Sequence, residues 1–169
     1  IFKNIYQVEP GQNFIFDLKN NSLRKKRFWA IDNGPDYNLF FKKIKIDEFK
    51  NKFDSILSSH FVSDKKPAFL LSSGIDSYLI AKTYLKKKKK CNTFTLGFDQ
   101  KSFDESVVVK SLKNKFNKKI YKLKLSESKF VLKNLSKKID HPFGDPSIIP
   151  TYKIFKKIKG FTNVSIGGD

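Results

Sequence analysis

Apolar and polar positions over residues 47–169 repeat in the pattern of alternating strands and helices. Short apolar runs have the length of buried strands, at 67–71, 91–98, 119–125 and 162–166. Segments with apolar residues at helical spacing alternate with them, at 47–61, 76–86, 104–116, 127–138 and 150–159. Strands and helices that alternate through short connections predict an α/β fold, with a parallel sheet, flanking helices and right-handed crossovers.

Residues 1–29 have a different pattern, typical of antiparallel strands. The runs "FIFDL" and "SLRKKRFW" read as two strands joined by the turn-forming cluster Lys19-Asn20-Asn21, and "VEPGQ" (8–12) as a further turn. A segment this short cannot bury a core alone, so we expect the last strands of a domain whose remainder is missing. Residues 30–46 contain Asn33-Gly34-Pro35-Asp36 and are predicted to be a linker.

The stretch "AFLLSSGIDSYLIAKTYL" (68–85) predicts a buried strand, a small turn and an amphipathic helix. Ser72-Ser73-Gly74 would lie where the strand ends and the helix begins, and unpaired N–H groups at a helix start suit a phosphate. Asp76 fits such a site only if a cation such as Mg²⁺ bridges it to the phosphate. The alternative is an ordinary capped helix start, with Asp76 favoured by the helix dipole.

Polar segments follow several of the predicted strands: 72–77, 97–105, 141–147 and 167–169. In a parallel sheet the ligand binds at the carboxyl ends of the strands, so these four segments should converge on one edge. Asp104 and Glu105 fit a site there and fit a helix start equally well. Asp145-Pro146-Ser147 reads as a turn or as part of the site, and we favour the site.

The net charge of +19 raises the alternative of a basic nucleic-acid-binding module. The lysines are spread from end to end, however, and arginine occurs only at positions 24 and 27. Lys, Asn, Phe and Ile share AT-rich codons, so a biased genome would produce this composition without selection for charge. We therefore expect no dedicated nucleic-acid surface.

Three features of the composition limit the class of protein to which this chain can belong. Cys91 is the one cysteine, which excludes an internal disulfide and suits a reducing cytoplasm. No apolar run approaches the length of a membrane span, so no membrane partner is expected. The sequence contains no methionine even at position 1, which indicates a processed chain or a fragment.

The loop "LSSGIDS" resembles the S-G-G-x-D-S pyrophosphate-binding loop of the ATP-pyrophosphatase group. Three further stretches, "TFTLGFD…FDES" (93–106), "IDHPFGDPSIIPTY" (139–152) and "VSIGGD" (164–169), resemble the synthetase domain of glutamine-hydrolysing asparagine synthetase in order and spacing. Residues 1–29, with "IFKNIYQVEPGQ" and "RFW", resemble the tail of that family's glutaminase domain. The resemblance covers nearly the whole chain.

The resemblance implies an adenine nucleotide alpha hydrolase-like fold and three regions: a glutaminase tail (1–29), a linker (30–46) and a C-terminally truncated synthetase domain (47–169). It implies ATP-dependent amidation of aspartate to asparagine through β-aspartyl-AMP, with Mg²⁺ and with ammonia from glutamine. It allows a homodimer of the full-length protein, and this fragment is not expected to be active alone. Close relatives amidate other acids in polysaccharide or secondary-metabolite synthesis, which is the alternative.

The resemblance also assigns roles to residues. Ser72, Ser73, Gly74, Asp76 and Ser77 would hold pyrophosphate, with Mg²⁺ on Asp76. Leu70 and Leu96 would flank the adenosine, Gly167 and Gly168 would let the backbone approach ATP, and Asp169 would lie beside the aspartyl-adenylate.

Three positions depart from the family pattern. Ser73 replaces a glycine, which would strain the loop if that position needed a positive φ. His141 stands where an acid is usual, and Gly167 stands where serine is usual.

Overall fold

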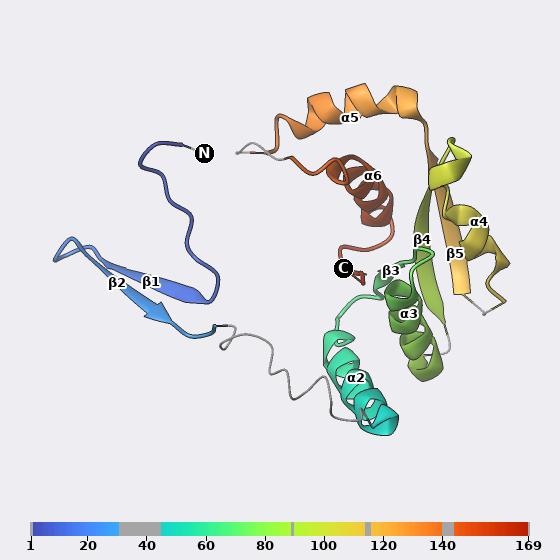
Figure 1. Cartoon of the computed structure of the whole chain (residues 1–169), viewed down its shortest axis with the longest axis horizontal. Coiled ribbons are helices and arrows are strands. Elements are labelled where there is room, and N and C mark those ends of the chain that lie inside the picture. Colours follow the sequence, from blue (N-terminus) through green and yellow to red (C-terminus); the bar gives the residue numbers. More distant parts are fainter. Residues whose placement is uncertain (1, 31–44, 89, 114–115, 140–143, 169) are drawn as a thin grey trace. The chain divides into compact units, whose positions relative to one another are not determined.

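The computed structural model describes residues 2–30, 45–88, 90–113, 116–139 and 144–168. The chain forms two compact units, Ile1–Lys45 and Ile46–Asp169 (Figure 1). None of the helices in the described ranges is both long enough and apolar enough to cross a membrane.

The first unit is the predicted β-hairpin. Strands β1 (Gln12–Asp17) and β2 (Ser22–Arg27) pair antiparallel. The carboxylate of Asp17 accepts hydrogen bonds from the backbone of Lys19 and Asn20, which closes the predicted turn. No residue in the described range 2–30 is buried, so the hairpin has no core of its own.

The second unit contains a parallel four-stranded sheet in the order β5-β4-β3-β6, which confirms the predicted α/β class. Its strands are β3 (Ala68–Leu70), β4 (Cys91–Phe98), β5 (Phe116–Leu123) and β6 (Ser165–Ile166). Its helices are α2 (Ile46–His60), α3 (Ile75–Lys88), α4 (Ser106–Ser111), α5 (Ser128–Leu135) and α6 (Ile148–Lys159), with 3₁₀ turns η1 (Lys101–Phe103) and η2 (Leu125–Glu127).

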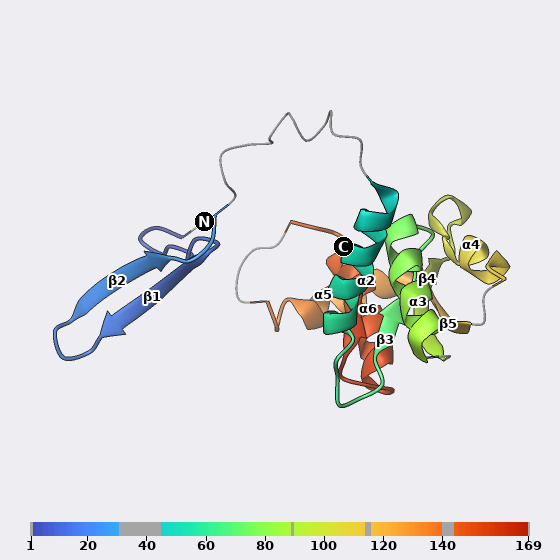
Figure 2. The ribbon, with the colours of Figure 1, turned by 90° about the horizontal axis from the view of Figure 1, so that it is seen from below.

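Side chains from the two faces of the sheet enter two separate apolar clusters, because successive strand residues point to opposite faces. Phe69 and Cys91 pack with buried residues of α2, α3 and α4. Ala68 and Phe94 lie an odd number of positions from Phe69 and Cys91 along the same strands, and they pack instead with Ile154 and Ile158 of α6. Figures 1 and 2 show α3 and α6 on different sides of β3.

Aromatic rings tie helix α2 to the first of these clusters. The ring centroid of Phe61 lies 5.1 Å from that of Tyr84 and 5.9 Å from that of Phe69. Leu57 and Phe61 are buried as the amphipathic pattern predicted, whereas Phe49 and Ile56 remain exposed. The buried stripe of α2 is therefore narrower than the sequence indicated.

The helix predicted over 104–116 is wrong in extent. Helix α4 spans only the six residues Ser106–Ser111 of that range, and strand β5 already begins at Phe116. Strand β5 pairs with β4 along its whole length, from Phe116 opposite Cys91 to Leu123 opposite Phe98. Backbone pairing with β4 thus takes the last predicted position, Phe116, into a strand, in which its polar backbone groups find partners.

Candidate functional site

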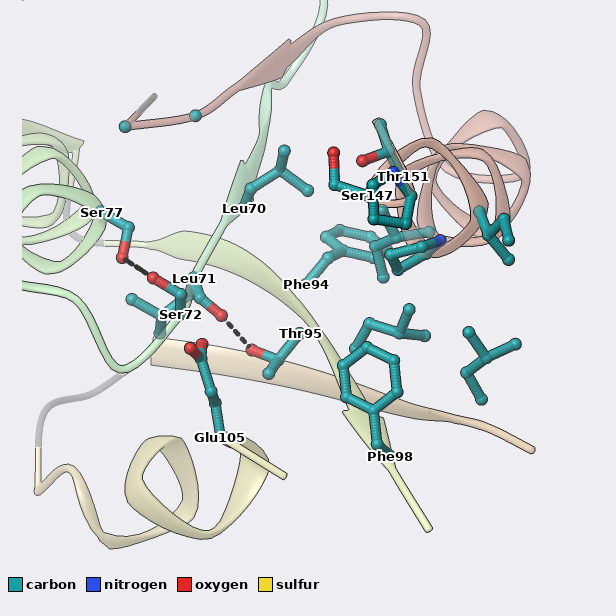
Figure 3. Close-up of a pocket in the computed structure, with 18 of the residues that line it drawn as sticks. Leu70, Leu71, Ser72, Ser77, Phe94, Thr95, Phe98, Glu105, Ser147 and Thr151 are labelled. Carbon is teal, nitrogen blue, oxygen red and sulfur yellow. Dashed lines mark hydrogen bonds between the residues drawn. The ribbon is translucent and has the colours of Figure 1, made fainter. Parts of the chain in front are cut away.

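The turn between β3 and α3 is braced by serine hydroxyls. The Ser77 hydroxyl accepts a hydrogen bond from the Ser72 backbone N–H (3.1 Å), donates one to the Gly74 carbonyl (3.1 Å), and lies 2.9 Å from the Ser72 hydroxyl (Figure 3). The Gly74 backbone N–H donates to the Ser72 hydroxyl. Ser77 is buried beneath the turn. Two of the serines therefore fix the shape of the turn, in addition to any bond they could offer a ligand.

Ser73 does not strain this turn. Positive φ angles occur in the described residues only at Gly11, Asn4 and Asn21. A serine is accordingly tolerated where the resembled loop has a glycine. The Ser73 backbone N–H points away from the turn's own hydroxyls and donates to the carboxylate of Glu105 at 3.1 Å.

A cavity of about 1070 Å³ lies beside this turn, at the carboxyl ends of β3, β4 and β6 and against the start of α6 (Figure 3). Its apolar wall comes from Leu70, Leu71, Phe94, Leu96, Phe98, Leu123, Pro146, Ile149, Pro150 and Ile154. Its polar wall comes from Ser72, Ser77, Thr95, Asp99, Gln100, Glu105, Ser128, Ser147 and Thr151, with the backbone of Gly167 and Gly168. The size and the mixed lining suit a small organic ligand.

The structure brings together six of the residues to which the resemblance assigns a role. Leu70, Ser72, Ser77, Leu96, Gly167 and Gly168 all line the cavity. Ser73, Gly74 and Asp76 lie outside its lining, exposed on the turn and on the first turn of α3. Asp169 and His141 lie outside the described residues.

The two glycines after β6 differ in how tightly they pack. A Cβ on Gly168 would lie 2.8 Å from the backbone nitrogen of Ser77 and 3.1 Å from the backbone carbonyl carbon of Asp76. A Cβ on Gly167 would meet only the side chain of Leu70, at 3.4 Å. Only glycine therefore lets the end of β6 approach the start of α3 at position 168.

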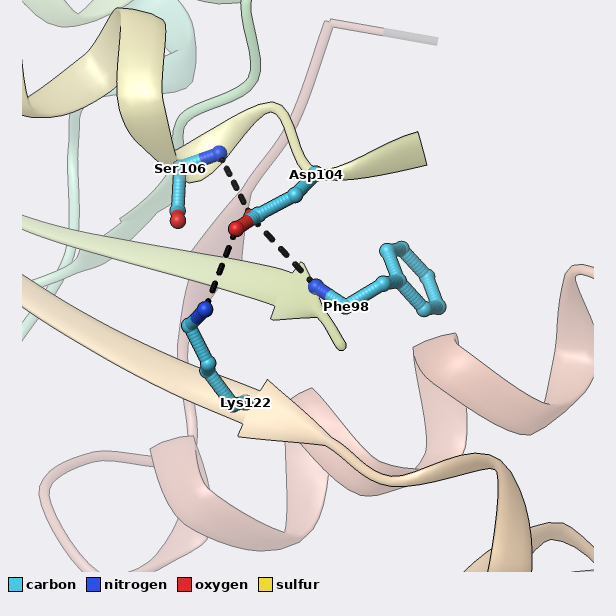
Figure 4. Close-up of polar contacts among 4 residues, drawn as sticks. All are labelled: Phe98, Asp104, Ser106 and Lys122. Carbon is cyan, nitrogen blue, oxygen red and sulfur yellow. Dashed lines mark hydrogen bonds and ion pairs between the residues drawn. The ribbon is translucent and has the colours of Figure 1, made fainter. Parts of the chain in front are cut away.

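A nearly buried carboxylate holds the segment between β4 and α4. Asp104 Oδ1 accepts hydrogen bonds from the backbone N–H groups of Ser106 (3.1 Å) and Phe98 (3.4 Å), and Oδ2 lies 3.2 Å from Lys122 Nζ (Figure 4). The Asp104 side chain is 7% exposed. Hydrogen bonding by Ser106, and after it the charge and hydrogen bond of Lys122, outweigh burial and lower the pKa of Asp104 to about 2. Asp104 thus stays ionised and acts as a structural anchor.

Gly97 makes room for this anchor, since a Cβ there would lie 2.5 Å from Asp104 Oδ1. The sequence alone left Asp104 balanced between a helix start and a functional acid. The structure places its carboxylate at the helix start, where it accepts a hydrogen bond from the N–H of Ser106, the first residue of α4, and it also binds the end of β4.

The described lining of the cavity carries two acids, Asp99 and Glu105, and neither lysine nor arginine. An anionic ligand therefore cannot be neutralised by side chains of this wall alone. Across the described residues, no group of three or more His, Cys, Asp or Glu could hold a metal ion. A cation at this site would have to be coordinated by a carboxylate and by the bound anion together.

Several lining residues were not anticipated from the sequence. Thr95 donates from its hydroxyl to the Leu71 carbonyl at 2.7 Å, which ties the ends of β4 and β3 together. Phe94 lines the cavity and also packs against α6 in the core. The alternation of inward and outward positions along β4 was the available signal, but it does not say which inward residues meet a cavity.

The segment Asp145-Pro146-Ser147 was expected to be either a turn or part of the site, and its residues differ in this respect. Pro146 and Ser147 line the cavity, whereas Asp145 lies outside the lining and accepts a hydrogen bond from the Ser147 backbone at 2.8 Å. That bond keeps the pKa of Asp145 below its ordinary value. Asp145 therefore shapes the turn that presents Ser147.

Comparison with known proteins gives a consistent result. The asparagine synthase family model matches residues 48–169. The "Putative asparagine synthetase [glutamine-hydrolyzing] 2" of Methanocaldococcus jannaschii is 32% identical over 174 residues, covering 100% of this chain and 33% of that protein. The "Asparagine synthetase [glutamine-hydrolyzing] 1" of Bacillus subtilis is 26% identical over 172 residues, covering 98% of this chain and 26% of that protein. The chain thus spans a third or less of the length of these relatives.

Proposed function

The chain belongs to the asparagine synthase family, and from that premise we propose that it carries the ATP-binding part of an enzyme that amidates aspartate to asparagine. The observation that carries the proposal is the position of the 72–77 turn beside a large cavity at the carboxyl edge of a parallel sheet. That edge is where sheets of this kind bind nucleotides.

The apolar part of the cavity is the proposed adenosine site. Leu70 and Leu96, from adjacent strands, and Phe94 line it. A flat purine buries apolar surface well against leucine and phenylalanine side chains. The backbone of Gly167 and Gly168 supplies a wall without side chains, along which a ribose or phosphate could lie close.

The turn is the proposed pyrophosphate site. The first amides of α3 lie at the positive end of a fourteen-residue helix, while the N–H groups of Ser72, Ser73 and Gly74 are hydrogen-bonded within the protein. Asp76, exposed in the first turn of that helix, is the proposed protein ligand of Mg²⁺. The donor set fits, because Mg²⁺ is commonly held by one or two carboxylates together with phosphates and waters. When bound, Mg²⁺ would neutralise charge on the departing pyrophosphate.

In the proposed reaction, the aspartate side-chain carboxylate attacks the α-phosphate of ATP, which gives β-aspartyl-AMP and releases pyrophosphate. Ammonia from glutamine then displaces AMP. The residues of this chain bind and orient: the turn holds the leaving group, the apolar wall fixes the adenosine, and Asp169 is proposed to lie beside the adenylate. The Ser72 and Ser77 hydroxyls keep the turn in shape.

The N-terminal hairpin is proposed to be the tail of a glutaminase domain that would supply the ammonia. Its apolar side chains Phe14, Ile15 and Phe16 alternate between the two faces of the hairpin. Each of them is at least 37% exposed, so both faces are uncovered. A hairpin that leaves both faces apolar and uncovered requires further structure to pack against.

Two alternatives remain distinct outcomes of experiment. The cavity does not identify the acid that is amidated, so an acid from polysaccharide or secondary-metabolite synthesis is the second candidate substrate. The basic nucleic-acid-binding module is disfavoured, because the asparagine synthase family model matches residues 48–169.

The decisive experiment uses the full-length protein with aspartate, ATP, Mg²⁺ and glutamine. We expect asparagine, AMP and pyrophosphate in equal amounts, and aspartate-dependent exchange of pyrophosphate into ATP. Glutamine hydrolysis without asparagine would favour another acid. Absence of exchange with every acid tested, in a protein that folds, would contradict the proposal.

A further inference from the structure

The backbone N–H of Ser73 is held by an anion from another element of the fold. Glu105 Oε2 accepts its hydrogen bond at 3.1 Å, and the carboxylate of Glu105 lies close to the 72–77 turn (Figure 3). Glu105 occupies the N-cap position of α4, yet its side chain makes no cap hydrogen bond to that helix. The carboxylate therefore satisfies the turn in preference to its own helix.

The neighbouring anchor explains why Glu105 reaches the turn. Asp104 is fixed to the end of β4 through the Phe98 N–H and to β5 through Lys122 (Figure 4). Glu105 is the next residue after Asp104, so the contacts of Asp104 also hold the backbone of Glu105 in place. The segment between β4 and β5 thus positions Glu105 against Ser73.

The amides of the turn divide into two kinds by their partners. Ser72 and Gly74 donate to serine hydroxyls within the turn, which are neutral. Ser73 donates to a carboxylate, which is an anion like the phosphate proposed to bind there. A phosphate oxygen that takes the Ser73 N–H must displace Glu105, and the two negative charges cannot share that donor at close range.

We propose that Glu105 is an internal competitor of phosphate at this turn. It occupies the Ser73 N–H when no nucleotide is bound, and it leaves when pyrophosphate arrives. This inference rests on the proposed function of the same site. Only those molecules in which Glu105 has left the Ser73 N–H can bind pyrophosphate fully. The observed affinity for pyrophosphate is therefore lower than the intrinsic affinity of the free turn.

The test is calorimetric titration of the full-length protein with magnesium pyrophosphate, comparing the wild type with Glu105→Gln. Glutamine keeps an acceptor of similar shape and removes the charge. We expect Glu105→Gln to bind about three- to tenfold more tightly, and Glu105→Ala at least as tightly, because a charge-assisted bond no longer has to be broken. Glu105 is exposed, so both variants should melt at the wild-type temperature.

Asp99→Asn is the matched control. Asp99 lines the same cavity and carries the same charge as Glu105. The backbone N–H of Ser73, however, donates its hydrogen bond to Glu105 and not to Asp99. We expect its affinity for magnesium pyrophosphate to change by less than about twofold, since it does not occupy the turn.

Each other result has a definite meaning. Equal or weaker binding by Glu105→Gln would overturn the competitor role, as would equal tightening by Glu105→Gln and Asp99→Asn. No binding of magnesium pyrophosphate by the folded wild type would overturn the proposed nucleotide site itself, and the inference with it. Binding by the wild type that Glu105→Gln leaves unchanged would overturn the inference alone.

Discussion

Gly168, at the end of β6, lies directly against the backbone of Ser77 at the start of α3, where a Cβ would come within 2.8 Å of the Ser77 nitrogen. The two residues are far apart in the sequence of the second unit. Their contact fixes the distance between the turn that begins α3 and the glycine wall of the cavity. The shape of the proposed pyrophosphate site therefore depends on residue 168 being a glycine, which has no side chain.

Gly168→Ala should destabilise the protein by about 1–3 kcal/mol, because the new methyl group meets backbone atoms that cannot rotate away. Gly167→Ala is the control, since its methyl group would meet only the Leu70 side chain at 3.4 Å and should cost less than about 1 kcal/mol. Urea unfolding of the full-length protein measures both. Equal stability of the two variants would contradict the packing argument.

Asp76→Asn should lower aspartate-dependent ATP–pyrophosphate exchange by about a hundredfold or more, because it removes the charge proposed to hold Mg²⁺. Glutaminase activity of the full-length protein should be largely unchanged. Asp47→Asn is a matched control: Asp47 is also an exposed acid in the first turn of a helix, but that helix is α2 and not the helix that follows the 72–77 turn. It should cost about 0.3–1 kcal/mol of stability and leave exchange near the wild-type rate.

Exchange by Asp76→Asn at close to the wild-type rate would reduce Asp76 to a residue that favours a helix start. A loss of exchange in both aspartate variants would point to folding and not to the metal. Thermal melting of each variant separates these outcomes.

Asp104→Asn should remove part of the protein's sensitivity to acid. The folded pKa of about 2 lies below the ordinary value of 3.8, so ionised Asp104 stabilises the fold above about pH 4. That stabilisation is lost as the pH falls through about 2. The melting temperature of the wild type should therefore exceed that of the variant above pH 4, and the difference should shrink between pH 4 and pH 2. A difference that does not vary with pH would show that Asp104 acts only through its shape.

Cys91 should resist alkylation in the native protein. Burial raises the pKa of its thiol to about 12, and the side chain is fully enclosed in the core. Iodoacetamide at pH 8, followed by mass spectrometry of the peptide that contains Cys91, should find it unmodified. The same treatment in guanidinium should modify it fully. Rapid native modification would mean that the core around the start of β4 opens readily.

The sequence by itself determined the local elements of this protein. Alternating apolar runs and helical stretches predicted the parallel sheet, and Lys19-Asn20-Asn21 predicted the hairpin turn. The strand, small turn and helix at 68–88 were also readable, because Gly74 and the apolar spacing act within a few residues. Backbone periodicity and turn chemistry are local, so they are visible without knowledge of the fold.

Tertiary structure alone decided the contacts that complete the site. The spacing over 104–116 fits a helix, but α4 ends at Ser111 and the strand that pairs with β4 begins at Phe116. The role of Asp104 depends on Lys122 and Phe98, which the sheet brings beside it, and the partner of the Ser73 amide is a glutamate from the next strand's connection. These pairings arise from strand order and register, and a charged or glycine residue fits a helix start, a turn or a buried contact equally well until its neighbours are known.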